Sequence, residues 1–177
     1  KQLRPLLEFV RDRGVARVWA AHSGLVPPES LGPHPAGTFR WTRGGVEAAS
    51  EVAHDQGNWV LGGRVTWGKG AGALVWQRSM RYNQLDDTWL ILDRLSHHPE
   101  GPRHWAFCFS PGIQLTQLPQ PGKVRVALPS GRVLVWHADP PGETVIEAGW
   151  VAPEYGRRVA APVLRRAVAG DTSESRL

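Results

Sequence analysis

The chain has 177 residues, 41% of them hydrophobic, which is enough for one domain with a sizeable core and short for two. Lys and Arg number 21 against 16 Asp and Glu, so the formal net charge of +5 favours an acidic partner such as a uronic-acid polymer, a sulfated glycan or nucleic acid. The single cysteine, Cys108, excludes an intrachain disulfide, and no apolar stretch is long enough to span a bilayer.

The first predicted element is a short amphipathic helix. Leu3, Leu6, Leu7 and Val10 recur at helical spacing, and Gly14 marks the expected end. We expect residues 1–18 to form this helix and a linker. Residues 15–41 contain several prolines, and each residue before a proline is pushed out of the helical region, so this stretch is interpreted as extended loop.

Strand-like runs fill most of the remaining chain. Apolar and β-branched residues alternate with polar ones between Gly, Pro, Asn and Asp clusters, which is typical of strands and turns. The clearest hairpin joins two alternating runs across Pro129-Ser130-Gly131. The predicted strands are 46–54, 63–67, 73–82, 88–95, 103–110, 122–128, 132–137, 144–150 and 162–168.

This series of strands predicts an all-β protein, either a two-layer sandwich or a barrel. We expect residues 19–168 to form the domain and the small, polar residues 169–177 to form a disordered tail. Alternation must place one face of each strand inside. The predicted core therefore includes Val124, Val126, Val133, Val135, Ile91 and Phe107 or their immediate strand neighbours.

Several constellations have an ordinary structural interpretation. His97, His98 and His104 lack carboxylates or thiolates at ligand spacing, so a metal cluster is not expected. The glycine-rich stretch around Lys69 lacks the strand-loop-helix context of a phosphate-binding loop and is interpreted as a β-connection. Cys108 lies in an apolar run and is expected to be a buried small hydrophobe.

Five segments carry a family resemblance when they are taken in order. Residues 77–82 form an Arg-bearing run, residues 89–95 end in Asp-Arg-Leu, and residues 104–112 open with His and end in Pro-Gly. Residues 39–43 are similar to an FRWxR motif, and residues 149–164 to an SPxYG…APVL motif in which Ala152 stands where Ser is usual. Over about 20–168 the chain thus resembles the heparinase II/III-like polysaccharide lyases.

The resemblance implies an antiparallel two-layer β-sandwich in a periplasmic or secreted protein. Together with the short N-terminal helix predicted above, this makes the expected fold an all-β sandwich with a short N-terminal helix. The resemblance also implies that an (α/α) toroid, in the same parent protein or a separate chain, supplies most of the catalytic residues. With only Tyr82 and Tyr155 available, no catalytic residue is assigned here. The paired arginines Arg40, Arg43, Arg78 and Arg81 are the candidate substrate-binding residues, provided that they converge; dispersed, they are solvated charge.

One residue inherits a metal-binding role from the resemblance. His22 stands in Ala-His-Ser-Gly, similar to the family's AHNT motif, whose His is a zinc ligand in some members. The chain lacks the GHxHAD segment and the VDPG-like turn that supply the other ligands. Because one His cannot hold zinc, we expect no cofactor in the isolated chain, and a zinc site at His22 only with a partner domain.

Two functions remain open at this stage. The first is the β-domain of a lyase that cleaves a uronic-acid-containing polysaccharide by β-elimination, inactive without its helical domain. The second is a non-catalytic carbohydrate-binding or assembly module. Nucleic-acid binding is not favoured, because no recognition helix, RNA-stacking motif or zinc finger is visible.

Overall fold

The computed structural model describes residues 23–26, 46–55, 58–96, 103–154, 157–168 and 172–177. Regular structure in this part of the chain consists of strands and one 3-10 turn, η2 (Gly70–Gly72), which connects two strands of a hairpin. The strands are β1 (Gly24–Val26), β2 (Val46–Asp55), β3 (Asn58–Trp67), β4 (Leu74–Asn83), β5 (Thr88–Ser96), β6 (Arg103–Cys108), β7 (Gln114–Gln117), β8 (Lys123–Ala127), β9 (Val133–Asp139), β10 (Thr144–Glu154), β11 (Arg157–Val168) and β12 (Thr172–Arg176).

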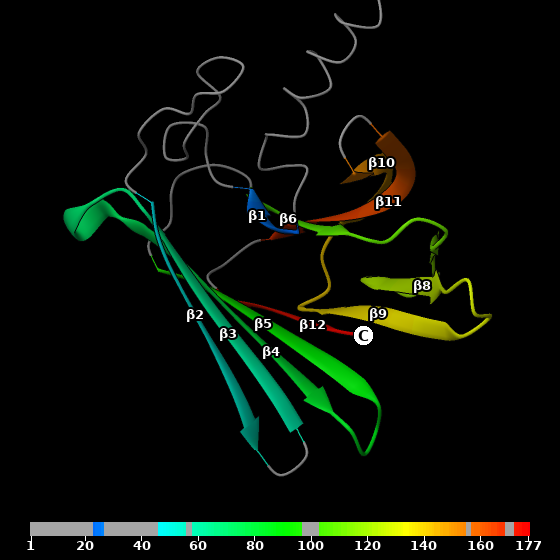
Figure 1. The fold of residues 1–177 in the computed structure, drawn as a ribbon, viewed down its shortest axis with the longest axis horizontal. Helices are drawn as coiled ribbons and strands as arrows, with labels where there is room; N and C mark the ends of the chain where they lie inside the picture. Colours follow the sequence, from blue (N-terminus) through cyan, green and yellow to red (C-terminus); the bar gives the residue numbers. More distant parts are fainter. Residues whose placement is uncertain (1–22, 27–45, 56–57, 97–102, 155–156, 169–171) are drawn as a thin grey trace, which may run out of the picture.

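The strands form two antiparallel sheets (Figure 1). A four-stranded sheet has the order β1-β6-β11-β10, and an eight-stranded sheet has the order β2-β3-β4-β5-β12-β9-β8-β7. In Figure 1 the β2–β5 strands extend well beyond the smaller sheet. The predicted antiparallel β-sandwich is confirmed, whereas the helix expected within residues 1–18 lies outside the described residues.

The core lies between the two sheets. It contains large side chains of both layers, because each strand turns alternate residues inward. Ile91, Phe107, Val124 and Val126 are buried, as the alternation predicted. The largest buried side chains are those of tryptophans, and they belong to both sheets: Trp67, Trp105 and Trp136.

The prediction that Val133 and Val135 are buried is wrong for these two residues themselves, but its stated alternative, that their immediate strand neighbours are in the core, is confirmed by Leu134 and Trp136. Their exposed fractions are 45% and 47%, because in the β8–β9 hairpin Val126 stands opposite Leu134 and the buried Val124 stands opposite Trp136. Residues directly opposite in a sheet share a face. The bulkier Leu134 and Trp136 therefore point inward, and the two valines point outward.

The predicted disordered tail at 169–177 is also wrong for its last residues. Strand β12 lies inside the eight-stranded sheet and pairs with β5 on one side and β9 on the other. Ser175 is 1% exposed, and the backbone of Leu177 exchanges hydrogen bonds with that of Trp89 at 2.7 and 2.9 Å. Two further strands, β1 and β7, also occur where none was predicted.

Arg166 connects the two sheets. It lies on β11 of the four-stranded sheet and is 1% exposed. Its guanidinium donates hydrogen bonds to the backbone carbonyl of Glu174 on β12, at 3.1 Å, and to that of Pro140. Burial lowers the pKa of Arg166, although the charges of Asp93 and Asp139 oppose this shift. The cation therefore has a structural role between the layers.

Candidate anion-binding cleft

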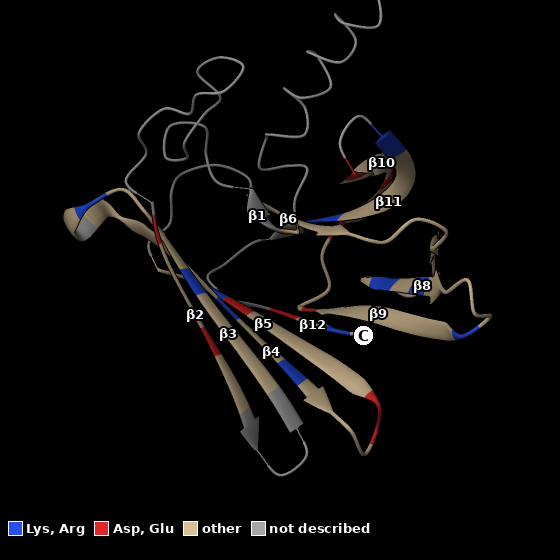
Figure 2. Cartoon of the chain, viewed as in Figure 1, with Lys and Arg blue, Asp and Glu red and all other residues tan. Residues whose placement is uncertain are grey.

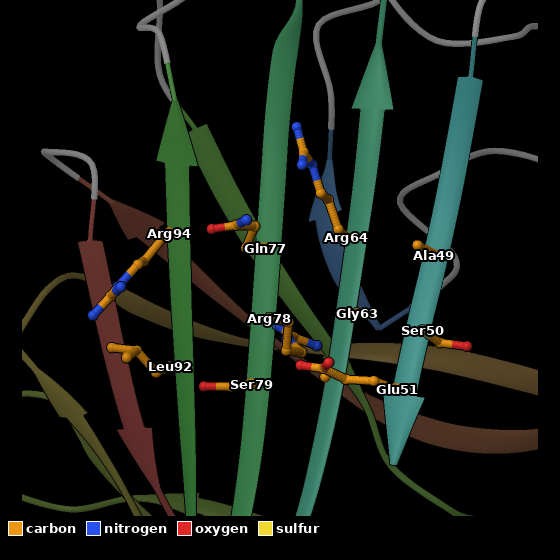
Figure 3. A pocket seen from close by; sticks show the side chains of 11 residues that line it. Ala49, Ser50, Glu51, Gly63, Arg64, Gln77, Arg78, Ser79, Leu92 and Arg94 are labelled. Carbon is orange, nitrogen blue, oxygen red and sulfur yellow. The ribbon is translucent and has the colours of Figure 1, made fainter. Parts of the chain in front are cut away.

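A cleft of about 480 Å³ lies over β2, β3, β4 and β5 (Figure 3). Strand alternation places most of its polar lining on the face of the eight-stranded sheet that points away from the core. The exposed polar residues of this face that line it are Glu51, Arg64, Gln77, Ser79 and Arg94. Figure 2 shows acidic residues on β2 and basic residues on the neighbouring β3 and β4.

Two arginines flank a glutamine across the cleft. Arg64 on β3 stands directly opposite Gln77 on β4, and Gln77 stands directly opposite Arg94 on β5. All three side chains are exposed, and Figure 3 shows the two arginines on either side of Gln77. Within the described part of the chain, neither Arg64 nor Arg94 forms an ion pair.

Gly62 makes room for the side chain of Glu51 in the next row of the cleft. It stands opposite Glu51 on one side and Ser79 on the other. A Cβ atom at Gly62 would lie 2.6 Å from both Cγ and Oε1 of Glu51, so the glutamate side chain lies over the glycine backbone. The cleft thus combines two cations that have no ion-pair partner among the described residues with a carboxylate, an amide and a hydroxyl.

Arg78 occupies the opposite, inward face of β4. Its Nε and Nη2 atoms donate hydrogen bonds to the two carboxylate oxygens of Asp93 at 2.8 and 2.9 Å, and Trp76 Nε1 donates to Asp93 Oδ1 at 2.7 Å. The guanidinium carbon also lies 5.0 Å from the centroid of Trp76 and 5.8 Å from that of Trp105. Asp93 is 1% exposed, so this is a buried ion pair.

This geometry does not fit the prediction that Arg78 binds substrate, because its guanidinium is already bonded to Asp93. The period-two alternation of strands offers the reason: Arg78 and Arg81 are three residues apart and so belong to opposite faces of β4. Arg81 is exposed on the outer face, and its role in substrate binding stays a prediction. Arg40, Arg43 and His22 lie outside the described residues.

Among the other candidates from the sequence, Tyr82 has a structural partner, His104 is exposed, and the rest lie outside the described residues. Tyr82 donates a 2.8 Å hydrogen bond to Asp87 Oδ1 at the β4–β5 hairpin and packs against Trp89. His104 is an exposed residue of β6. Tyr155, His97 and His98 fall outside the described residues.

Two further arginine pairs, at residues 157–158 and 165–166, do not form a common binding surface. Arg157 pairs with Glu154 at 2.7 Å, and Arg165 pairs with Glu147 at 2.6 Å. Arg158 lies over the ring of Trp150, 5.2 Å from its centroid. With Arg166 buried, these four cations already have local partners.

Cys108 is half-buried beside the end of β1. Its backbone N–H donates to Ser23 Oγ at 2.9 Å. Burial raises the pKa of the Cys108 thiol, although a hydrogen bond with Ser23 and the charge of Arg165 oppose this shift. A thiol held in its protonated form is a poor nucleophile, which agrees with a packing role.

The described residues contain neither a candidate metal cluster nor a helix that could cross a membrane. No group of three or more His, Cys, Asp or Glu within them could hold a metal ion. The described part of the chain alone therefore does not form a zinc site, and the role of His22 stays a prediction. No described helix has the length and apolar character needed to cross a membrane.

Sequence reasoning missed Arg64 and Arg94. Each lies within or beside a predicted strand, but the chain separates them by thirty positions, and only the β3-β4-β5 register puts them on one row. The sequence offered one local signal for Arg94. Arg94 directly follows Asp93, and because successive side chains of a strand point to opposite faces, a buried Asp93 requires an exposed Arg94.

Comparison with known proteins agrees with this fold. The chain aligns structurally with heparan sulfate lyase HepC from Pedobacter heparinus, with a TM-score of 0.67, 18% identity and coverage of 94% of the chain. A heparinase III structure aligns with a TM-score of 0.56 and 13% identity over 73% of the chain. The chain spans only 25% and 21% of the lengths of those two proteins.

No curated protein sequence matches the chain. The family model for the heparinase II/III-like C-terminal domain matches residues 10–175, which is nearly the whole chain and includes every described strand except the last residue of β12. Its match agrees with the two antiparallel sheets described above. The chain therefore belongs to the heparinase II/III-like, C-terminal family.

Proposed function

We propose that the chain is the β-domain of a polysaccharide lyase that cleaves a uronic-acid-containing acidic polysaccharide by β-elimination. The family match over residues 10–175 is the observation that carries this proposal. The similar structures are a heparan sulfate lyase and a heparinase III, and the chain spans about a quarter or less of each, which leaves room for a separate catalytic domain in a parent protein.

The chemistry supports a division of labour between two domains. β-Elimination next to a uronic acid removes the C5 proton, which requires a base and a group that neutralises the carboxylate. In the described part of the chain, Tyr82 is bonded to Asp87 and Arg78 to Asp93, so neither side chain is available for these roles. Arg64, Arg81 and Arg94 form no ion pair with any described residue and are suited to binding a polyanion.

Ultraviolet absorbance of the unsaturated uronate product tests this proposal. The assay compares the 177-residue chain with a protein in which the chain is joined to its helical domain, on heparan sulfate, hyaluronan, chondroitin and alginate. We expect product only from the joined protein. Turnover by the chain alone would contradict the division of labour, and binding without product in the joined protein would establish the non-catalytic module instead.

A further inference from the structure

We propose that the cleft lined by Arg64, Gln77 and Arg94 is a subsite for two neighbouring anionic groups of an acidic polysaccharide. The proposal rests on the proposed function, and it adds the residues that hold the polymer and the pattern of anions that they select. None of the three residues was a candidate in the sequence, and none is part of a hydrophobic core.

The first argument is that Arg64 and Arg94 have no carboxylate partner among the described residues. Several other exposed or half-exposed arginines carry carboxylate partners, among them Arg132 with Asp87, Arg157 with Glu154 and Arg176 with Glu174. Arg64 and Arg94 do not, within the described residues. An anionic ligand can therefore bind them without first displacing a protein carboxylate, and a planar guanidinium matches carboxylate and sulfate oxygens in a bidentate manner.

The second argument is the spacing. Arg64 and Arg94 are two strands apart on one row of the sheet, so their Cα atoms are about 10 Å apart at the usual strand spacing. This span is comparable to one disaccharide, the repeat in which many acidic glycans present their charges. The sheet backbone fixes the separation, while the long side chains adapt to carboxylate or sulfate.

The third argument is what lies between and beside the cations. Gln77, Ser79 and Glu51 provide an amide, a hydroxyl and a carboxylate, which suit the hydroxyl groups of a sugar. The described lining contains no Phe, Tyr or Trp on which a nucleic-acid base could stack. The combination of anion-binding and hydroxyl-binding groups favours an acidic glycan over a nucleic acid.

The test measures binding of heparan sulfate oligosaccharides to the full 177-residue chain by calorimetric titration at two salt concentrations. The double variant R64Q/R94Q is compared with R157Q/R165Q, which removes two cations from the other sheet. We expect roughly tenfold weaker binding and a smaller salt dependence for R64Q/R94Q, with little change for the control. Gln77→Ala should give a smaller loss, and circular dichroism checks that each variant keeps the fold.

Equal losses in both double variants would overturn the subsite, because binding would then follow net charge alone. Unchanged binding by R64Q/R94Q, or no binding of heparan sulfate by the wild-type chain, would overturn it as well. Single-stranded DNA that binds the wild type as tightly as heparan sulfate would contradict the glycan assignment. Product formation by the joined protein is scored separately, so a functional lyase with an irrelevant cleft is distinguishable from a chain that belongs to no lyase.

Discussion

Arg78 and Asp93 stand directly opposite each other on β4 and β5, and two hydrogen bonds of 2.8 and 2.9 Å join the guanidinium to the two carboxylate oxygens. Trp76 adds a third donor to the carboxylate. This pair lies on the inward face, where burial makes each charge dependent on the other.

Replacing Asp93 by Asn should destabilise the fold by about 3–5 kcal/mol, because Arg78 would remain half-enclosed among aromatic rings without its counter-charge. Urea unfolding followed by tryptophan fluorescence measures the change. Asp86→Asn in the exposed β4–β5 turn is the matched control and should change stability by less than about 0.5 kcal/mol. Equal effects of the two substitutions would show that the buried pair contributes nothing particular.

Arg166 and its neighbour Arg165 should respond differently to replacement by Lys. Lys lacks the guanidinium fork that donates to the carbonyls of Glu174 and Pro140, so Arg166→Lys would leave the buried cation with at least one hydrogen bond fewer, at a cost of about 1–3 kcal/mol. Arg165→Lys alters a partly exposed pair with Glu147 and should cost less than about 1 kcal/mol. Thermal unfolding of both variants distinguishes these expectations, which fail if the order is reversed.

Gly149→Ala should destabilise the protein by about 1–3 kcal/mol, because the new Cβ would lie 2.6 Å from Val163 Cγ2 and 3.0 Å from the carbonyl oxygen of Ala161. Gly63→Ala is the matched control in another strand, since nothing lies within 4 Å of its added Cβ. The control should be neutral or stabilising by up to about 1 kcal/mol. Denaturation midpoints that coincide for the two variants would contradict the steric argument.

The Cys108 thiol should react slowly with iodoacetamide in the folded protein. Because burial raises its folded-state pKa, the native state holds this proton more tightly than the unfolded chain does. The resulting stabilisation is full below the ordinary thiol pKa of about 8.5 and is lost as the pH rises through the folded-state pKa. At pH 8, iodoacetamide should therefore label Cys108 faster in the urea-unfolded chain than in the folded protein. Equal labelling rates in the two states would refute the prediction.

The alternation of apolar and polar side chains made most of the fold predictable. It could not decide which face of a strand points inward where the residues of both faces are apolar. Residues 133–136 read Val-Leu-Val-Trp, so periodicity alone did not choose between the two faces. The turn between the two strands sets the register. Gly131 adopts a φ of 84°, its backbone N–H donates to the carbonyl oxygen of Leu128, and the N–H of Leu128 donates to the carbonyl oxygen of Arg132. That geometry sets Leu134 and Trp136 opposite buried partners.

Long-range pairing accounts for what the sequence did not reveal. Residues 172–176 read Thr-Ser-Glu-Ser-Arg, a polar run with no strand signal, and they form a strand because β5 and β9 supply partners on both sides. The same applies to the cleft, since Arg64 and Arg94 become neighbours only through β4. Charge counts favoured an acidic partner, but only the register shows which arginines lie on one row.

The place of β12 in the eight-stranded sheet also bears on the order of assembly during synthesis. Strands β2–β5 and strands β7–β9 form two consecutive meanders, each paired internally, but β5 and β9 are bridged only by residues 172–176. A nascent chain emerging from the ribosome would therefore expose two open sheet edges until these residues are released. Unpaired edges invite association with other chains, so the insertion of β12 protects both meanders from such association.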